Sequence, residues 1–275
     1  MFATIINDCR DQNAMGRQAT RVASLLGCPV TSIGVVHDLE AAGTLVDALD
    51  AAEKREGVVL VNVAPRQSNG HQTEKSGVGY LIAKTGKRPN GSPFGAFFYG
   101  KTLVISSLDG FTLALAKKLG VVESVKCFHI PTIVEELTGK GVLTPEVAKR
   151  MVDTQFRSFD FLPRAAAWLL SGVALPFEEQ TLDMAVPDPL VWLVDSFGNV
   201  KTTLLAEDIE FNEGSATKTA FGNLTAHARL KDVPDGVSAL VVGSSGIEEK
   251  RFLEIVIQGK NAAEHLGITV GARVI

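Results

Sequence analysis

The chain has few cysteines, no long apolar run and no concentration of positive charge. Its 275 residues include three cysteines, with no CxxC pair and no Cys/His cluster, so neither a disulfide scaffold nor a structural zinc site is predicted. No uninterrupted apolar run approaches about 20 residues, so no membrane-spanning segment is expected. The net charge of -4, without a basic block, disfavours binding to nucleic acid or to an anionic membrane.

Several familiar sequence signatures are also missing. The chain contains no GxGxxG, GxxxxGK[ST] or HExxH motif, and its five histidines are scattered, so we predict neither a bound metal nor a separate cofactor. The first ten residues include Asp8 and have no basic start or long apolar stretch, unlike a signal peptide. These absences favour a soluble, reduced protein of the cytoplasm.

The first 175 residues alternate between short apolar runs and helix-like segments. Residues 2–6, 30–36 and 58–63 are expected to be strands, while residues 14–26 and 39–55 have helical spacing. The apolar run at residues 58–63 is continuous and rich in β-branched residues, which is typical of a strand buried on both faces. This order predicts an α/β domain with a mainly parallel sheet, and a hydrophobic content of 45% suffices for its core.

The composition changes in a proline-containing stretch near residue 180. Beyond it, short β-rich runs are separated by Gly, Asn and Asp turns, which predicts a small antiparallel β-barrel. We therefore expect an N-terminal α/β domain at residues 1–175, a linker at 176–186 and a β-barrel C-terminal domain at 187–275.

Polar residues after the first strand and in one turn of the second domain are candidate ligand contacts. The Asp8 carboxylate can accept two hydrogen bonds from a vicinal diol such as a ribose, although an Asp in this place more often caps a turn or helix. Asp195 offers a carboxylate for a ligand ammonium. Phe197 offers a ring for stacking, and Asn199 offers a carboxamide that can pair with a purine edge. The alternative for this second segment is an ordinary hairpin turn.

Two further groups each have two interpretations. Ser244 and Ser245 follow an apolar strand in a Gly-Ser-Ser-Gly turn, whose hydroxyls and backbone N–H groups can hold a carboxylate, or which is simply a hairpin loop. Arg150, Arg157 and Arg164 recur at seven-residue spacing, which favours a solvated helix face over an anion clamp.

Several segments resemble a known family. Residues 194–203 (VDSFGNVKTT) resemble the D-x-F-G-N-x-x-T-N segment of the S-adenosylmethionine (SAM) hydroxide adenosyltransferases, the family that also contains the fluorinases and chlorinases. Residues 243–246 and 253–267 resemble that family's closing stretch, which runs from S-S-G through L-E-I-A to S-A-A-x-x-L-G. Residues 6–11 resemble its opening T-D-F-G-x-R-D, one residue shorter here. Residues 154–170 resemble a segment that ends in F-A-P-A-A-A-x-L.

The resemblance implies an α/β domain followed by a small β-barrel. It also implies a homotrimer whose sites lie between the N-terminal domain of one subunit and the C-terminal domain of its neighbour. The substrate would be SAM. In the N-terminal domain, Asp8 would hold the ribose hydroxyls, and Asp11 and Asn13 would meet the methionine end.

In the C-terminal domain, the resemblance implies six contacts, each to one part of the SAM molecule. They are Asp195 for the methionine amino group, Phe197 and Asn199 for the adenine, Ser244 and Ser245 for the methionine carboxylate, and the Gly259 backbone N–H for the adenine edge. Together these residues would hold both ends of the ligand.

The segments that handle water in the hydrolytic relatives depart from the family pattern in this chain. Those relatives use an Asp, an Arg and a His, but the Asp position is Ala64 here and the His of the H-G-R-D segment is absent. The candidate catalytic residues are Arg66 and Ser158, the latter as an anion contact. Arg66 with His71 and His129 is an alternative acid–base set.

The reaction that the resemblance implies is cleavage of the bond between the ribose 5′ carbon and the sulfonium sulfur. The sulfonium makes that carbon an electrophile with a neutral thioether as leaving group, so the enzyme need only hold a desolvated nucleophile in line. We expect a SAM hydrolase that gives adenosine and L-methionine. The alternatives are a halogenase that forms 5′-halo-adenosine and a non-catalytic sensor of SAM or adenosine.

Overall fold

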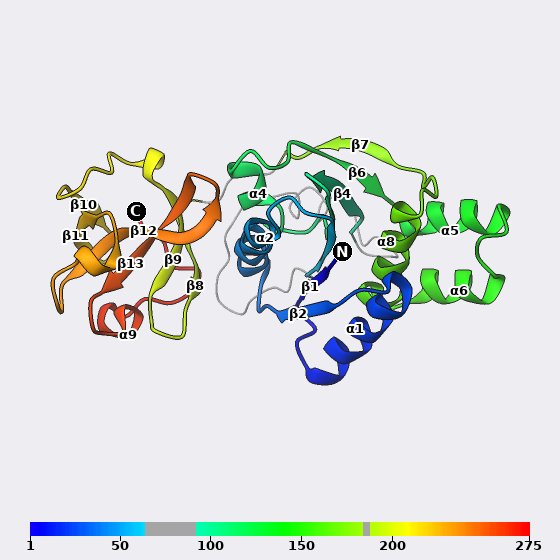
Figure 1. Cartoon of the computed structure of the whole chain (residues 1–275), viewed down its shortest axis with the longest axis horizontal. Coiled ribbons are helices and arrows are strands. Elements are labelled where there is room, and N and C mark those ends of the chain that lie inside the picture. The colour runs from blue at the N-terminus through cyan, green and yellow to red at the C-terminus, as the bar shows by residue number, and fades with distance from the viewer. Residues whose placement is uncertain (64–91, 184–187) are drawn as a thin grey trace. The chain divides into compact units, whose positions relative to one another are not determined.

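The computed structural model describes residues 1–63, 92–183 and 188–275 of the chain. These residues belong to two compact units, Met1–Ala185 and Val186–Ile275, and each unit has its own sheet and core (Figure 1). Within the described ranges, no helix combines the length and the apolar character needed to cross a membrane.

The first unit is built on a seven-stranded sheet with the order β2-β1-β3-β5-β4-β6-β7. Four of these strands are mutually parallel, namely β1 (Ala3–Asn7), β2 (Val30–Gly34), β3 (Gly57–Asn62) and β5 (Thr102–Ser107). The other three pair in antiparallel fashion, namely β4 (Phe94–Tyr99), β6 (Ser124–Phe128) and β7 (Glu178–Thr181). Strands β1, β3 and β5 are buried along their whole length, and apolar residues make up half or more of each.

The first two helices begin at residues that satisfy exposed backbone N–H groups. Helix α1 (Gln12–Leu26) is capped by Asp11, whose side chain accepts from Ala14 N at 2.9 Å, and it ends at Gly27 with φ of 63°. Helix α2 (Asp38–Ala52) begins where His37 Nδ1 accepts from the backbone N–H of Glu40 at 3.1 Å.

The remaining described helices of this unit are short, and they are α4 (Ala114–Lys118), α5 (Ile130–Gly139), α6 (Pro145–Asp153), α7 (Arg157–Asp160) and α8 (Leu162–Leu170). Trp168 of α8 packs, partly buried, on the core that contains Phe94 and Phe161. Because α6, α7 and α8 are separate helices, the expected continuous helix face of Arg150, Arg157 and Arg164 is wrong.

Part of the segment expected to be a linker belongs to the first sheet. Strand β7 pairs with β6, with Val125 opposite Gln180, and Leu182 is almost completely buried. These backbone hydrogen bonds and the burial of Leu182 keep the segment at the sheet edge, although its sequence of Glu, Glu, Gln and Thr carries no apolar signal.

The second unit contains a six-stranded sheet with the order β10-β11-β12-β13-β9-β8 (Figure 1). Its strands are β8 (Val191–Val194), β9 (Val200–Leu205), β10 (Ala216–Thr219), β11 (Gly222–His227), β12 (Ser238–Ile247) and β13 (Lys250–Ile257). The 3-10 turns η1 (Ala206–Asp208) and η2 (Leu230–Asp232) and helix α9 (Ala262–Leu266) complete it. The core includes Leu204, Leu240 and Leu253, and Trp192 is fully buried.

The pairings of this second sheet are antiparallel except between β11 and β12, which run parallel. The connection through residues 228–237 returns the chain before β12 starts, so the two strands point the same way. The predicted fold class is confirmed: a mainly parallel α/β unit is followed by a smaller, mainly antiparallel β unit.

Candidate functional site

A hollow of about 700 Å³ lies beside the β8–β9 turn of the second unit. Its wall brings together five residues that the sequence analysis placed on the ligand, namely Asp195, Phe197, Asn199, Ser244 and Gly259. They come from three segments that are distant in sequence, and the volume is in the range of small-molecule sites. The hollow is therefore the candidate ligand site of this unit.

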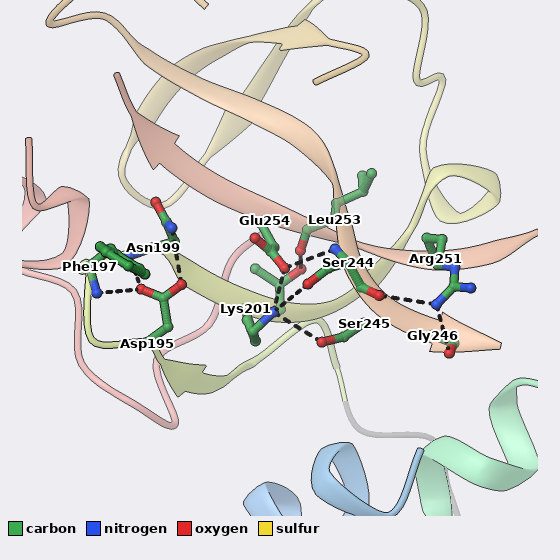
Figure 2. A network of polar contacts seen from close by, with 11 residues as sticks. Asp195, Phe197, Asn199, Lys201, Ser244, Ser245, Gly246, Arg251, Leu253 and Glu254 are labelled. Atoms are coloured by element: carbon green, nitrogen blue, oxygen red, sulfur yellow. Dashed lines mark hydrogen bonds and ion pairs between the residues drawn. The ribbon is translucent and has the colours of Figure 1, made fainter. Parts of the chain in front are cut away.

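The turn at residues 195–199 is fixed by the side chain of Asp195. Its Oδ1 accepts from the backbone N–H groups of Phe197 and Asn199, each at 2.9 Å, and its Oδ2 accepts from Asn199 Nδ2 at 3.0 Å (Figure 2). The hairpin-turn interpretation therefore describes the local structure. A carboxylate has about four acceptor sites, so Asp195 retains acceptor capacity and negative charge for a ligand ammonium.

The same turn presents an aromatic ring and packs on the start of α9. Phe197 is 78% exposed although it is a large apolar side chain, which makes its ring available for stacking. Gly198 has φ of 84°, and its carbonyl accepts from Ala263 N at 3.0 Å. Gly259, with φ of 77°, lies in the turn closed by the 3.2 Å hydrogen bond from Lys260 N to Ile257 O.

A polar network centred on Lys201 lies at the hollow (Figure 2), and its members Lys201, Ser244 and Glu254 line it. Lys201 Nζ donates to Glu254 Oε1 at 2.6 Å, to Ser245 Oγ at 3.0 Å and to Ser244 Oγ at 3.2 Å. Lys201 and Glu254 are register partners on β9 and β13, and their side chains are only 11% and 10% exposed. Because both charges are largely removed from water, their pairing is what makes their burial tolerable.

The two serines lie within strand β12 and not in the turn that was expected. The ladder between β12 and β13 shifts between Val242 and Gly246, so the serines sit in an irregular part of the strand. Ser244 N donates to Glu254 Oε1 at 3.2 Å, so this backbone N–H is already used. Arg251 Nη1 donates to the carbonyls of Ser244 and Gly246 at 3.0 and 3.1 Å, which ties the irregular segment to β13.

A second polar cluster lies in the first unit, at the carboxyl ends of its parallel strands. Asp109 follows β5, and its Oδ2 lies 3.9 Å from Arg157 Nη2. Arg157 also donates to the Ser92 carbonyl, and its guanidinium lies 5.0 Å from the centre of the Phe94 ring. Burial lowers the pKa of Arg157, while the charges of Asp109 and Asp8 oppose that change. Arg157 is therefore a part-buried cation close to two carboxylates, and not a solvated surface residue.

Ser158, the candidate anion contact, is 3% exposed, and its Oγ has no hydrogen-bond partner among the described residues. Asp11, expected at the methionine end of the ligand, serves as the N-cap of α1. Asn13 lines a separate hollow of about 480 Å³, together with Arg17 and Phe159. The structure thus gives a local role to Asp11 and an accessible position to Asn13.

Arg66 and His71, considered for acid–base chemistry, and Ala64, which stands at the family's Asp position, lie outside the described residues. His129 follows β6, and its Nε2 lies 3.9 Å from Glu178 Oε2 of the edge strand β7.

The sequence analysis gave no role to Lys201, Glu254 or Asp109, although a signal for two of them was present. Lys201 and Glu254 are charged residues in strands that also carry buried apolar side chains, and a charged residue is rarely buried without a partner. Their mutual pairing follows from the register of β9 and β13, which the sequence does not contain.

A family model matches the second unit of this chain. Residues 190–275 match the family model described as the SAM hydroxide adenosyltransferase C-terminal domain. No curated protein matches the chain.

Two solved structures share the fold over nearly the whole chain. An uncharacterized conserved protein from Thermotoga maritima has a TM-score of 0.60 at 16% identity, covering 98% of this chain and 97% of that one. A conserved hypothetical protein from Thermus thermophilus has a TM-score of 0.57 at 19% identity, covering 99% of both chains.

The protein is thus a two-unit α/β and β protein with a ligand-sized hollow in its β unit. Its residues 190–275 match the C-terminal domain of the SAM hydroxide adenosyltransferases, in agreement with the resemblance seen in that part of the sequence.

Proposed function

We propose that this protein is an enzyme that binds SAM and cleaves its 5′ C–S bond with water, giving adenosine and L-methionine. One observation carries the proposal. A single hollow in the second unit is lined by Asp195, Phe197, Asn199, Ser244 and Gly259, which the family resemblance assigns to different parts of SAM.

The chemistry of these side chains matches the ligand. The Phe197 ring stacks on the adenine, and the Asn199 carboxamide pairs with its polar edge. The Asp195 carboxylate accepts from the methionine ammonium. In the first unit, Asp8 follows β1 and accepts from the ribose hydroxyls.

The reaction is a direct displacement at the 5′ carbon. A water oxygen forms a bond to this carbon as the C–S bond breaks, and the bonding electron pair goes to sulfur. The sulfonium thus becomes the neutral thioether of methionine, and one proton is released from the attacking water. Positioning and desolvation of the nucleophile supply most of what such a reaction requires.

A halide is the second candidate nucleophile, and the first unit supplies the observation that favours it. Arg157 is a part-buried cation, and the next residue, Ser158, has a buried hydroxyl without a partner in the described ranges. A cation and a hydroxyl donor are groups that stabilise a desolvated anion.

The test is incubation of the protein with SAM in ¹⁸O-labelled water, with and without chloride or fluoride, followed by mass spectrometry. Hydrolysis predicts methionine and adenosine carrying ¹⁸O at the 5′ position. A 5′-halo-adenosine identifies a halogenase. Tight SAM binding without any product would contradict the enzyme proposal in favour of a sensor, and absence of binding contradicts both.

A further inference from the structure

We infer that Lys201 is a specificity-determining residue of this site. Its ammonium, together with the hydroxyls of Ser244 and Ser245, receives the carboxylate of an adenosyl ligand that ends in an amino acid. The inference rests on the proposed function, because it takes the hollow of the second unit as the ligand site. It goes beyond the family resemblance, which implies the two serines alone.

The position of Lys201 is the first argument. Its side chain comes from β9 and lines the hollow, and its Nζ lies within hydrogen-bond distance of both serine hydroxyls (Figure 2). Ser244 lines the same hollow, with the buried Ser245 next to it, so a group that reaches the Ser244 hydroxyl from the hollow must also approach the ammonium. A carboxylate that does so gains a charge-assisted hydrogen bond, which is about twice as strong as a neutral one.

The hydrogen-bond inventory of the network is the second argument. An ammonium has three donors, and here they are directed to Glu254 and to the two serines. The hydroxyls are neutral acceptors that can also donate. When a carboxylate enters, Lys201 can exchange the Ser244 hydroxyl for the carboxylate oxygen and keep Glu254, while that hydroxyl turns to donate to the same carboxylate.

Glu254 is the positioning residue for Lys201. Its carboxylate is largely buried and accepts from both Lys201 Nζ and Ser244 N, so it joins the ammonium to the strand that carries the serines. A Cβ at residue 243 would lie 2.5 Å from Glu254 Cγ, so only glycine at that position allows this approach. Glu254 also compensates the lysine charge when no ligand is present.

The charge pattern of the hollow is the third argument. Asp195 and Lys201 line the same hollow and carry opposite charges. The amino-acid end of SAM also carries an ammonium and a carboxylate side by side. The hollow is thus complementary to a zwitterion, and its carboxylate-binding half depends on Lys201.

The test compares two ligands that differ only in the carboxylate. These are S-adenosylhomocysteine and its decarboxylated analogue, which keeps the amino group, and neither contains the reactive sulfonium. Calorimetry on the full-length protein is expected to show that the wild type prefers the carboxylate-bearing ligand by about tenfold or more. In the double variant Lys201→Gln/Glu254→Gln, which removes both charges together, that preference is lost while affinity for the decarboxylated analogue is retained.

Three further variants make the test specific. Lys201→Arg keeps the charge and is expected to keep most of the preference. Ser244→Ala removes one hydroxyl at an accessible position and reduces the preference. Lys260→Gln removes a lysine charge from the same hollow without touching the serines, so it changes the two affinities alike.

The outcomes distinguish this inference from the function on which it rests. An unchanged preference in the double variant, with a melting temperature close to that of the wild type, overturns the role of Lys201 and leaves the proposed function standing. If the double variant fails to fold, the single variant Lys201→Gln decides, because it removes the ammonium and leaves both serines in place. If neither ligand binds the wild-type protein, the proposed function fails and the inference fails with it.

Discussion

The backbone of Gly198 lies directly against the side chain of Asn261. A Cβ at residue 198 would lie 2.0 Å from Asn261 Oδ1, and the same oxygen accepts from Glu264 N at 3.0 Å to cap α9. The turn that carries Asp195 and Phe197 is therefore joined to the start of α9 through a contact that only glycine permits.

Replacement of this glycine is expected to destabilise the second unit. Gly198→Ala combines a positive φ with a steric clash, so the free energy of unfolding should fall by about 2–4 kcal/mol, measured by urea denaturation. Gly214 is the matched control, because it has φ of 80° and open space around its Cα. Gly214→Ala should cost about 1–2 kcal/mol. Equal losses in the two variants would show that the contact with Asn261 is unimportant.

The turn residues should matter for ligand affinity. Asp195→Ala and Asn199→Ala each leave a polar group of a SAM-like ligand without its partner, so each should weaken binding by about 1–3 kcal/mol in calorimetry. Because Asp195 also holds the turn, Asp195→Asn is the control that keeps an oxygen acceptor and removes the charge. Unchanged affinity in both alanine variants contradicts the site assignment.

The buried ion pair of the first unit should contribute strongly to stability. Arg157→Met removes the cation that lies 3.9 Å from the Asp109 carboxylate, which is 2% exposed, at an expected cost of about 3–5 kcal/mol. The double variant Arg157→Met/Asp109→Asn should recover most of that loss in thermal or urea denaturation. Equal destabilisation by the single and double variants would mean that the ion pair itself contributes little to the free energy of unfolding.

Replacement of Ser158 is expected to change the stability of the protein and its activity in opposite directions. Its buried Oγ has no partner among the described residues, so Ser158→Ala is expected to raise the free energy of unfolding by about 1 kcal/mol. If the hydroxyl contacts the nucleophile, the same variant should lower the rate of SAM cleavage. A stabilised variant with full activity would remove Ser158 from the catalytic site.

Cys28 should react more slowly with alkylating reagents when the protein is folded. Burial raises the pKa of this thiol, and the positive N-terminus opposes the change only in part. A raised pKa means less thiolate at a given pH, so the pH profile of alkylation should shift upward in the folded protein relative to the chain in urea. The residue-specific rate can be followed by mass spectrometry, and coincident profiles would contradict the assignment of burial.

The parallel core of the first unit could be predicted from the sequence, because β3 is almost continuously apolar, as expected of a strand that is buried throughout. It did not predict β7, whose four polar residues form a strand only because β6 offers an unpaired edge. The parallel pairing of β11 and β12 was missed for a related reason. Strand direction depends on how the connecting segment crosses the unit, and turn composition does not reveal it.

The candidate site was predictable where a motif is local. The turn at 195–199 contains its carboxylate, ring and carboxamide within five residues, so the sequence alone locates them. The Lys201–Glu254 pair could not be located in this way, because the two lie 53 positions apart in sequence and only strand register brings them together. Arg157 was misjudged because its burial depends on Asp109 and Phe94, which come from other elements.

The chain contains two tryptophans, Trp168 in the helix α8 of the first unit and Trp192 in the strand β8 of the second. Each unit therefore carries a single indole fluorophore. Replacing one of them with phenylalanine leaves an emission signal that reports on the other unit alone, and the fully buried Trp192 should shift to longer wavelength when its surroundings open. Denaturation curves of the two single-tryptophan proteins would then reveal whether the halves of the chain unfold together or one after the other.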